Sequence, residues 1–309
     1  MFLFESLPWY SVVMWFVVLA ALMLVNEMAR RSKYVSIALC VVLPIILTIF
    51  VWPKTAGEGS STGTWFHWVK VYSALAGCLI FMTIRYKKNL GDSKKDRILL
   101  ALPAIILAIN IMEAVIRDFQ CYSYAEGIVD GVWMYGGIWN IFNGIAGILN
   151  ILAISGWVSI FVSKDKNRDM IWADQLWFWV VAYDIWNFAY VYNCVSDHSF
   201  YAGLALLLSC TIPLYISKNG AWIQHRAYTL AAWMMFTMTF PEFVSTSKFA
   251  VQSSHNPTAL LVVSSLSLIA NVILVGYHFY KVFKYKRNPF KVDVHSDLKA
   301  YKKIVEENK

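Results

Sequence analysis

Charged residues are scarce in this sequence, because Asp, Glu, Lys and Arg together make up only 15% of its 309 residues. Hydrophobic residues make up 59%, a composition that excludes an ordinary soluble domain and indicates a membrane protein. The formal net charge of +8 would suit a nucleic-acid-binding protein, but the basic residues stand in short clusters between apolar runs. We therefore expect the lipid bilayer, and no nucleic acid, as a partner.

Several motifs of catalysis and cofactor binding are missing too. The sequence has no His-Glu-x-x-His motif, no pair of Cys-x-x-Cys motifs and no P-loop, so it predicts no metal site and no cofactor. Retinal binding would require a lysine in the middle of the last apolar run, whereas Lys281 lies at its end. These absences favour a protein that is not an enzyme and leave an enzyme as the alternative.

Long apolar runs are what the sequence has in abundance. A transmembrane helix needs about 20 predominantly apolar residues, and on this length we predict an all-α bundle of about nine transmembrane helices. The expected spans are 9–29, 34–53, 64–85, 98–117, 138–162, 171–192, 199–217, 221–243 and 258–281. The first ten residues lack the positive region of a cleavable signal peptide, so we expect the first span to be retained.

The positions of the Lys and Arg residues predict the orientation of these spans. Cytoplasmic segments of membrane proteins are enriched in Lys and Arg, which places the N-terminus outside and the C-terminus in the cytoplasm. Residues 1–283 should form the transmembrane bundle, and residues 284–309 a basic, solvated cytoplasmic tail. The basic residues that do not fall on the cytoplasmic side are Lys54, Lys70, Arg117 and Lys248.

Two cysteines are expected at the outer surface. Cys121 follows the predicted fourth span and Cys194 follows the sixth, whereas Cys40, Cys78 and Cys210 lie within spans. An oxidising exterior permits disulfides, so the pair Cys121 and Cys194 is the candidate disulfide of this chain.

Four spans in the second half resemble four in the first half, in the same order. The matches are MWFVV at 14–18 with LWFWV at 176–180, CVVLPII at 40–46 with SCTIPLY at 209–215, KVYS at 70–73 with RAYT at 226–229, and LAIN at 107–110 with LIAN at 268–271. Spans 1–4 and 6–9 would then form an inverted repeat, which is a recurring design of secondary transporters. The alternative is chance similarity, because Leu, Ile and Val recur in all apolar helices.

A few polar residues lie deep within the predicted spans, where an ionisable group is costly and faces a protein interior or a hydrated cavity. Asp184 and Asn187 share one face of the sixth span. We predict that Lys70 of the third span pairs with Asp184 or with Glu113 of the fourth. We assign no catalytic residue, and a buried network that fixes the helices is the alternative to a binding site. The candidate substrate-binding residues are His67, Lys70, Glu113, Asn140, Asn143, Asp184 and Asn187.

Three stretches resemble a bacterial family of multipass membrane proteins that is characterised only as a domain of unknown function. They are GTWFHWVKVYSALAGC at 63–78, WNIFNGIAGILNIL at 139–152 and YDIWNFAYVYNCVSDHSFYAG at 183–203. The resemblance covers nearly the whole chain and implies a prokaryotic plasma-membrane protein. It implies no activity.

The polar residues in the outer half of the spans favour transport of a small polar or charged solute. The alternatives are a membrane enzyme that acts on a lipid or another amphiphile, with His67 and a carboxylate as acid and base, and a receptor or sensor without turnover. An inverted repeat would favour transport, whereas a cavity that opens sideways to lipid would favour the enzyme.

Overall fold

The computed structural model describes residues 2–88, 90–91, 93–129, 131–157 and 159–309. It confirms the predicted all-α fold, since 69% of the protein is helical. Within the described residues, five stretches are helical, long and apolar enough to cross a membrane, and the count of nine spans is not confirmed. The five stretches are α1 (Trp9–Arg31), the run Lys33–Phe50, α5 (Trp65–Tyr86), α6 (Lys94–Cys121) and α12 (Pro257–Tyr285).

Shorter helices complete the bundle. They are α7 (Ile138–Leu152), α8 (Trp177–Cys194), α9 (Leu206–Ile216) and α10 (Trp222–Thr239). The run Lys33–Phe50 consists of α2 (Lys33–Ile37), the π-helical turn η1 (Ala38–Val42) and α3 (Leu43–Phe50), and a second π-helical turn, η3 (Tyr201–Ala205), precedes α9. The small elements are α4 (Trp52–Thr55), η2 (Ser196–His198), α11 (Glu242–Ser245), α13 (Lys299–Asn308) and two antiparallel hairpins, β1 (Gly127–Val129) with β2 (Val132–Met134) and β3 (Phe161–Val162) with β4 (Met170–Ile171).

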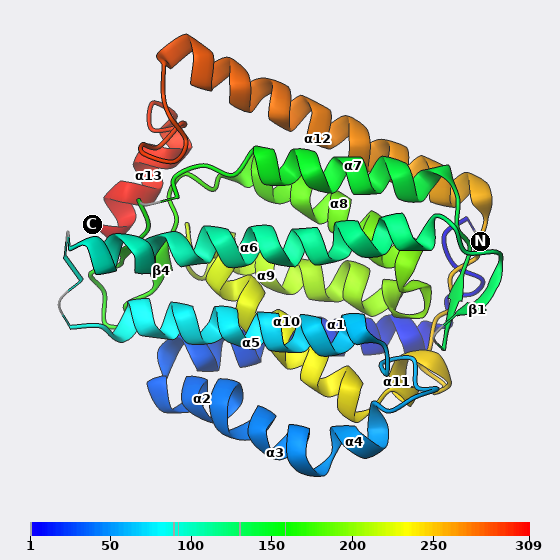
Figure 1. Ribbon diagram of the computed structural model, residues 1–309. Coiled ribbons are helices and arrows are strands. Elements are labelled where there is room, and N and C mark those ends of the chain that lie inside the picture. Colours follow the sequence, from blue (N-terminus) through cyan, green and yellow to red (C-terminus); the bar gives the residue numbers. More distant parts are fainter. Residues whose placement is uncertain (1, 89, 92, 130, 158) are drawn as a thin grey trace.

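The long helices run side by side between two ends of the bundle (Figure 1). The C-terminus, α13 and β4 lie at one end, which we call the basic end because the joints rich in Lys and Arg meet there. The N-terminus, α11 and β1 lie at the other end, which we call the opposite end. Successive long helices run in alternating directions, so the predicted cytoplasmic joints gather at the basic end and the predicted outer joints at the opposite end.

Local sequence explains where two of the helices begin and how closely a third packs on its neighbours. The Ser93 side chain caps α6 by accepting a hydrogen bond from the Asp96 N–H, and Asn256 caps α12 in the same way. On α7, a Cβ at Gly147 would lie 2.5 Å from Val115 Cγ2 and 2.7 Å from Trp186 Nε1. A glycine is therefore needed for α7 to approach α6 and α8 this closely.

The predicted fifth span, 138–162, is too long. α7 ends at Leu152, and Gly156 adopts a left-handed φ of 66° that turns the chain toward the β3–β4 hairpin. The apolar residues that follow, such as Ile154 and Ile160, are buried in this loop and not in a helix. Hydropathy could not separate the two cases, because a buried loop and a helix use the same apolar side chains.

The C-terminal tail packs against the bundle and ends in the helix α13. α12 extends to Tyr285, and the following residues fold back so that Val294 and Ile304 are buried. The Asp174 carboxylate accepts hydrogen bonds from the backbone N–H groups of Val294 (2.9 Å) and His295 (2.8 Å). The tail is thereby held against the basic end of the bundle.

Helix packing does not follow the predicted inverted repeat. In the described chain α8 packs along α12, whereas the corresponding pair, α1 and α6, makes no extensive contact, and α1 packs on α9 and α10. Local details do recur, because the Ser73 hydroxyl donates to the Lys70 carbonyl and the Thr229 hydroxyl donates to the Arg226 carbonyl. The two halves thus share local sequence and differ in the packing of this helix pair, and the inverted repeat stays a prediction.

Candidate functional site

A polar cavity of about 60 Å³ lies among α5, α6, α8, η2 and α10. Three of the predicted binding residues, His67, Lys70 and Asn187, line it together. The apolar part of its wall includes Phe66 and Trp233. The complete set of polar lining residues is His67, Lys70, Asn110, Tyr183, Asn187, Tyr190, His198 and Arg226.

Lys70 forms its ion pair with Glu113, one of its two expected partners. The Lys70 Nζ lies 3.0 Å from Glu113 Oε2, and it also donates to the Asn110 carbonyl oxygen at 2.8 Å. The Ser73 hydroxyl donates to the same Glu113 oxygen at 3.2 Å. Both charged groups are buried, and each has the hydrogen-bonded counter-charge that a buried ion requires.

The expected pairing of Lys70 with Asp184 is wrong. Asp184 Oδ2 accepts a hydrogen bond from the Thr211 hydroxyl at 2.7 Å, and Asp184 Oδ1 is buried without a partner. The residue lines a different, largely apolar groove of about 460 Å³ between α8, η3, α9 and α12. Asp184 is the residue after Tyr183 on α8. Its side chain therefore projects away from the face that Tyr183 and Asn187 present to the polar cavity.

Asn140 and Asn143 belong to a third polar cluster, around Asp118. Their amide groups donate to the two Asp118 oxygens at 3.3 Å and 2.7 Å, and the Cys194 thiol donates to Asp118 Oδ1 at 3.2 Å. The Asn143 oxygen accepts from the Ser267 hydroxyl on α12. These contacts connect α6, α7, α8 and α12, and neither asparagine is among the residues that line the polar cavity.

The two cysteines of the candidate disulfide are free thiols in the structure, and both are buried. The Cys121 thiol donates to the Met134 sulfur at 3.9 Å, and the Cys194 thiol donates to Asp118. The disulfide between Cys121 and Cys194 therefore stays a prediction.

Arg226 is the cavity residue that the sequence analysis did not select. It is only 5% exposed, its Nη2 donates to Asn187 Oδ1 at 3.3 Å, and its Nε donates to the Tyr183 hydroxyl at 3.4 Å. Its Nη1 is buried and has no hydrogen-bond partner among the described residues. One sequence signal pointed to this arginine, because RAYT at 226–229 matches KVYS at 70–73 and so aligns Arg226 with Lys70.

Two histidines lie where the cavity approaches the opposite end. The rings of His67 and His198 are 5.4 Å apart, and His67 Nδ1 lies 2.8 Å from the Thr64 hydroxyl. Burial lowers the pKa of His198 to about 4, so its imidazole is neutral at pH 7. In the described part of the chain, no group of three or more His, Cys, Asp or Glu residues is placed to hold a metal ion.

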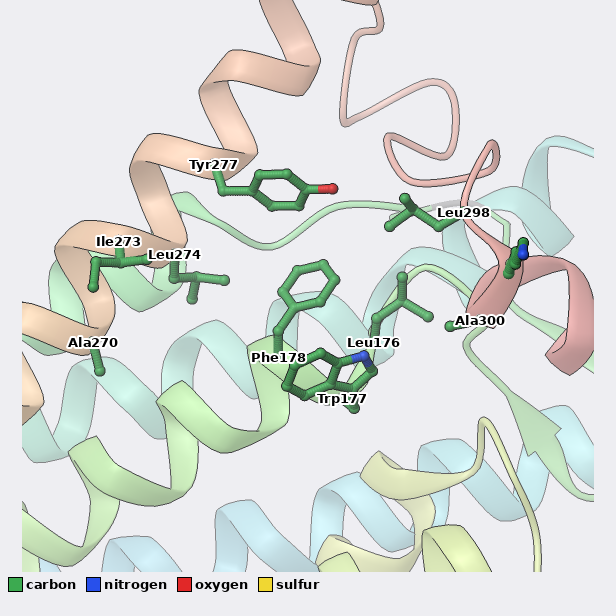
Figure 2. Close-up of a pocket in the computed structure, with 10 residues that line it drawn as sticks. Leu176, Trp177, Phe178, Ala270, Ile273, Leu274, Tyr277, Leu298 and Ala300 are labelled. Atoms are coloured by element: carbon green, nitrogen blue, oxygen red, sulfur yellow. The ribbon is translucent and has the colours of Figure 1, made fainter.

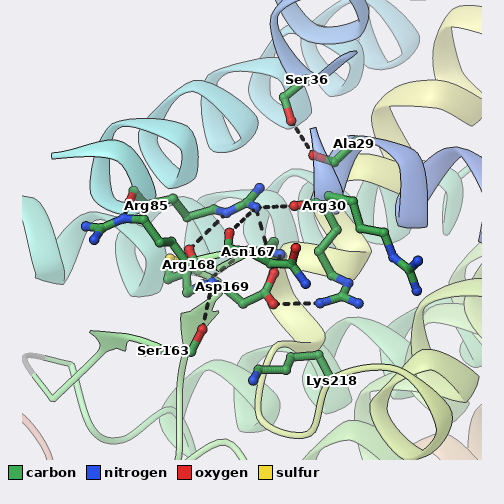
Figure 3. Close-up of polar contacts among 12 residues, drawn as sticks. Ala29, Arg30, Ser36, Arg85, Ser163, Asn167, Arg168, Asp169 and Lys218 are labelled. Atoms are coloured by element: carbon green, nitrogen blue, oxygen red, sulfur yellow. Dashed lines mark hydrogen bonds and ion pairs between the residues drawn. The ribbon is translucent and has the colours of Figure 1, made fainter. Parts of the chain in front are cut away.

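A dense polar network closes the basic end (Figure 3). Asp169 is fully buried; it accepts a hydrogen bond from Arg30 at 2.7 Å and another from Gln224 at 2.8 Å. Arg85 donates to the Arg30 carbonyl oxygen and, at 2.7 Å, to the Tyr228 hydroxyl. These bonds tie together α1, α5, α10 and the loop before β4. The network is saturated with protein partners, so we regard it as a closure and not as a binding site.

A cavity of about 580 Å³ lies between α8, α12 and α13 (Figure 2). Its walls are mainly apolar and include Phe178, Ile273 and Leu298, with Tyr277 and Lys299 as the polar exceptions. It contains neither a carboxylate nor a histidine that could act as a general acid or base. This cavity is suited to apolar chains and not to chemistry.

The loop between α4 and α5 carries a Gly-x-Ser-x-Gly sequence at 59–63, the spacing of a hydrolase nucleophile elbow. Such an elbow places the serine on a turn from a strand to a helix. Here Ser61 lies in a loop that follows a short helix, and its hydroxyl is buried without a hydrogen-bond partner. The local structure therefore does not support a serine nucleophile.

A sequence profile of a family of unknown function, DUF5692, matches residues 5–307. The chain therefore belongs to this family, in agreement with the resemblance of its three stretches. No curated protein and no solved structure matches the chain. The family description assigns no activity, so the function has to be argued from the site.

Proposed function

We propose that this DUF5692 protein transports a small polar or charged solute through the cavity among α5, α6, α8, η2 and α10. The observation that carries the proposal is the cavity itself, which Lys70 of α5 and Arg226 of α10 both line inside an apolar helical bundle. Ionisable residues within membrane-spanning bundles are costly and typically mark substrate or ion pathways. Transporter binding sites near the middle of the bilayer have this character.

The proposal includes the topology. The chain crosses a prokaryotic plasma membrane about nine times, with the N-terminus outside and the C-terminus in the cytoplasm. The alternating directions of the long helices and the gathering of Lys and Arg at the basic end support this arrangement. The cavity then lies nearer the outer surface, because its polar residues on α5 begin at His67, close to the start of that helix.

A transporter must expose its site to the two sides in turn, and the basic end has the contacts of a closed gate. Arg30, Asp169 and Gln224 join three segments there, and the docked tail covers the same end. We propose that these contacts separate when the site opens toward the cytoplasm. The free-energy difference between two conformations that exchange is small. A few buried ion pairs that form in one conformation and break in the other supply a difference of this size.

One observation suits the enzyme, because Asp184 lines the apolar groove of about 460 Å³, but the described lining of that groove has no second acid or base group. An enzyme that acts on lipid would need acid and base groups beside a cavity for apolar chains, and the wall of the 580 Å³ cavity has neither. His67 lines the small polar cavity of about 60 Å³ and Glu113 is paired with Lys70 beside it, so neither lies at a cavity for apolar chains.

The test is a swelling assay with purified protein in liposomes. An inward gradient of a small solute should cause faster swelling than in empty liposomes for at least one charge class among an anion, a cation, a zwitterion and a neutral polyol. Lys70→Met should abolish the difference, whereas Lys95→Met, an exposed lysine at the basic end, should not. If no class of solute enters faster than in empty liposomes, the transport proposal is wrong.

A further inference from the structure

We propose that the polar cavity is a binding site for a small monovalent anion, held between Arg226 and Lys70. This inference rests on the proposed function and names the substrate class of the same site. It starts from the charges of the cavity wall. Lys70 is neutralised by Glu113 at 3.0 Å, whereas among the described residues no carboxylate lies within ion-pair distance of the Arg226 guanidinium.

A buried guanidinium without a counter-charge is unfavourable, because the loss of water around the charge has to be offset by another charge or by a full set of hydrogen bonds. The protein supplies Arg226 with two neutral oxygen acceptors, from Tyr183 and Asn187, at long distances of 3.4 Å and 3.3 Å. Asp184, the next residue on α8, bonds to Thr211 and lines the other groove. Asp184 acts on Arg226 only through space, so among the described residues no ion pair neutralises the guanidinium directly.

Three buried polar atoms on the cavity wall have no partner within the described protein. They are Arg226 Nη1, the Tyr190 hydroxyl and His198 Nε2. A guanidinium N–H and a phenol O–H both donate, and a neutral imidazole can carry its proton on Nε2 and donate as well. An anion accepts hydrogen bonds from all three, whereas a cation would face the guanidinium charge. The unpartnered atoms thus point to an anion as the ligand.

Volume and charge define the class of anion. The cavity, of about 60 Å³, is small and can hold only a small ligand. A single guanidinium that no ion pair neutralises directly matches a single negative charge. Chloride, nitrate and formate fit both conditions, whereas a phosphate ester, a dicarboxylate or a sugar acid is too large or too highly charged.

Thermal unfolding of the purified protein in detergent tests this assignment, because a ligand that binds only the folded state raises the melting temperature with its concentration. Sodium formate, nitrate and chloride should each raise it in a saturable way relative to sodium gluconate at equal ionic strength. The rise should disappear in Arg226→Gln. It should persist in Arg97→Gln, which removes an exposed arginine on α6 outside the cavity.

Tyr190→Phe is the second variant, because it removes one proposed donor without a change of charge and so tests the site even if Arg226→Gln does not fold. We expect at least a tenfold weaker apparent affinity for formate. Equal melting temperatures in formate and gluconate, or an equal rise in Arg226→Gln, would overturn the anion site.

The outcomes also separate this inference from the proposed function. Formate that binds while no class of solute enters liposomes leaves the anion site in place and refutes transport. A cation or a neutral polyol that enters liposomes in a Lys70-dependent way, without stabilisation by any anion, leaves transport in place and refutes the anion site.

Discussion

Glu113 and Asp184 are two carboxylates deep in helices, and their different partners predict different effects of removing the charge. Glu113→Gln leaves the Lys70 ammonium buried without a counter-ion, which typically costs about 3–5 kcal/mol of folding free energy. Asp184→Asn should leave stability nearly unchanged or raise it, because Asp184 has no cationic partner and one of its oxygens is buried without a hydrogen bond. The melting temperatures of the two variants, measured against the unmodified protein, test this difference in stability.

A double variant decides whether the loss in Glu113→Gln comes from the stranded ammonium. Adding Lys70→Met should restore much of the lost stability, since it removes the unpaired charge. A loss that Lys70→Met does not reduce would show that Glu113 acts through other contacts, such as its hydrogen bond from Ser73.

At the scale of residues, the burial of charged side chains was easier to predict from the sequence than the residues that these side chains contact. Lys70, Glu113 and Asn187 were identified from their depth in apolar runs, and they do lie at the polar cavity or pair with a residue that lines it. Asp184 was assigned to the same face as Asn187, yet the rotation of α8 turns it toward another groove. Arg226 was not selected as a site residue, and only tertiary packing shows that it is enclosed at the cavity.

At the scale of helices, close packing of α7 gives a prediction with a matched control. A methyl group at Gly147 would clash with Val115 and Trp186, so Gly147→Ala should destabilise the protein by about 1–3 kcal/mol. Gly276→Ala on α12 should be neutral or stabilising by less than about 1 kcal/mol, since a Cβ there meets nothing within 4 Å. Chemical or thermal denaturation of both variants measures the difference, and equal stabilities would contradict the close approach of α7.

Docking of the C-terminal tail depends on Asp174. Its carboxylate accepts two backbone N–H groups of the tail and the Ser155 hydroxyl, and an amide at this position would turn its NH₂ toward a donor. Asp174→Asn should therefore release residues 286–309, which are rich in lysine, to cleavage by trypsin. Asp165→Asn, which removes the partner of Lys218, is the control and should leave the tail protected.

The tail should also loosen in acid. Slight burial favours the neutral acid, but hydrogen bonds from Lys281 and Arg287 outweigh it and lower the pKa of Asp297 to about 2. A carboxylate with a depressed folded pKa stabilises the docked state above its ordinary pKa near 3.8 and loses that contribution as the pH falls toward 2. Hydrogen exchange of tail peptides should rise relative to the core between about pH 5 and about pH 3. Asp297→Asn should show the faster exchange at both values.

At the scale of the whole molecule, the order of helices and the gathering of basic joints followed from apolar run lengths and from Lys and Arg positions. What the sequence could not predict is packing between distant helices. The inverted repeat was inferred from short matches such as LAIN and LIAN, but α8 packs along α12 whereas α1 does not pack along α6. Likewise the segment after α7 is apolar enough to be predicted as a continuation of the helix. The chain instead turns at Gly156, which packs beside Asp174.

The proposed orientation predicts which end of the bundle an impermeant thiol reagent reaches in intact cells. In a background without native cysteines, Ser123→Cys places an exposed thiol at the opposite end, and Lys95→Cys places one at the basic end. Ser123→Cys should react from outside and Lys95→Cys only after permeabilisation, because the Lys and Arg clusters hold the basic end in the cytoplasm. Both positions are exposed in the fold, so a difference between them reports the membrane and not local burial. The reverse labelling pattern would invert the topology, and labelling of both from outside would mean that the two ends are not separated by a bilayer.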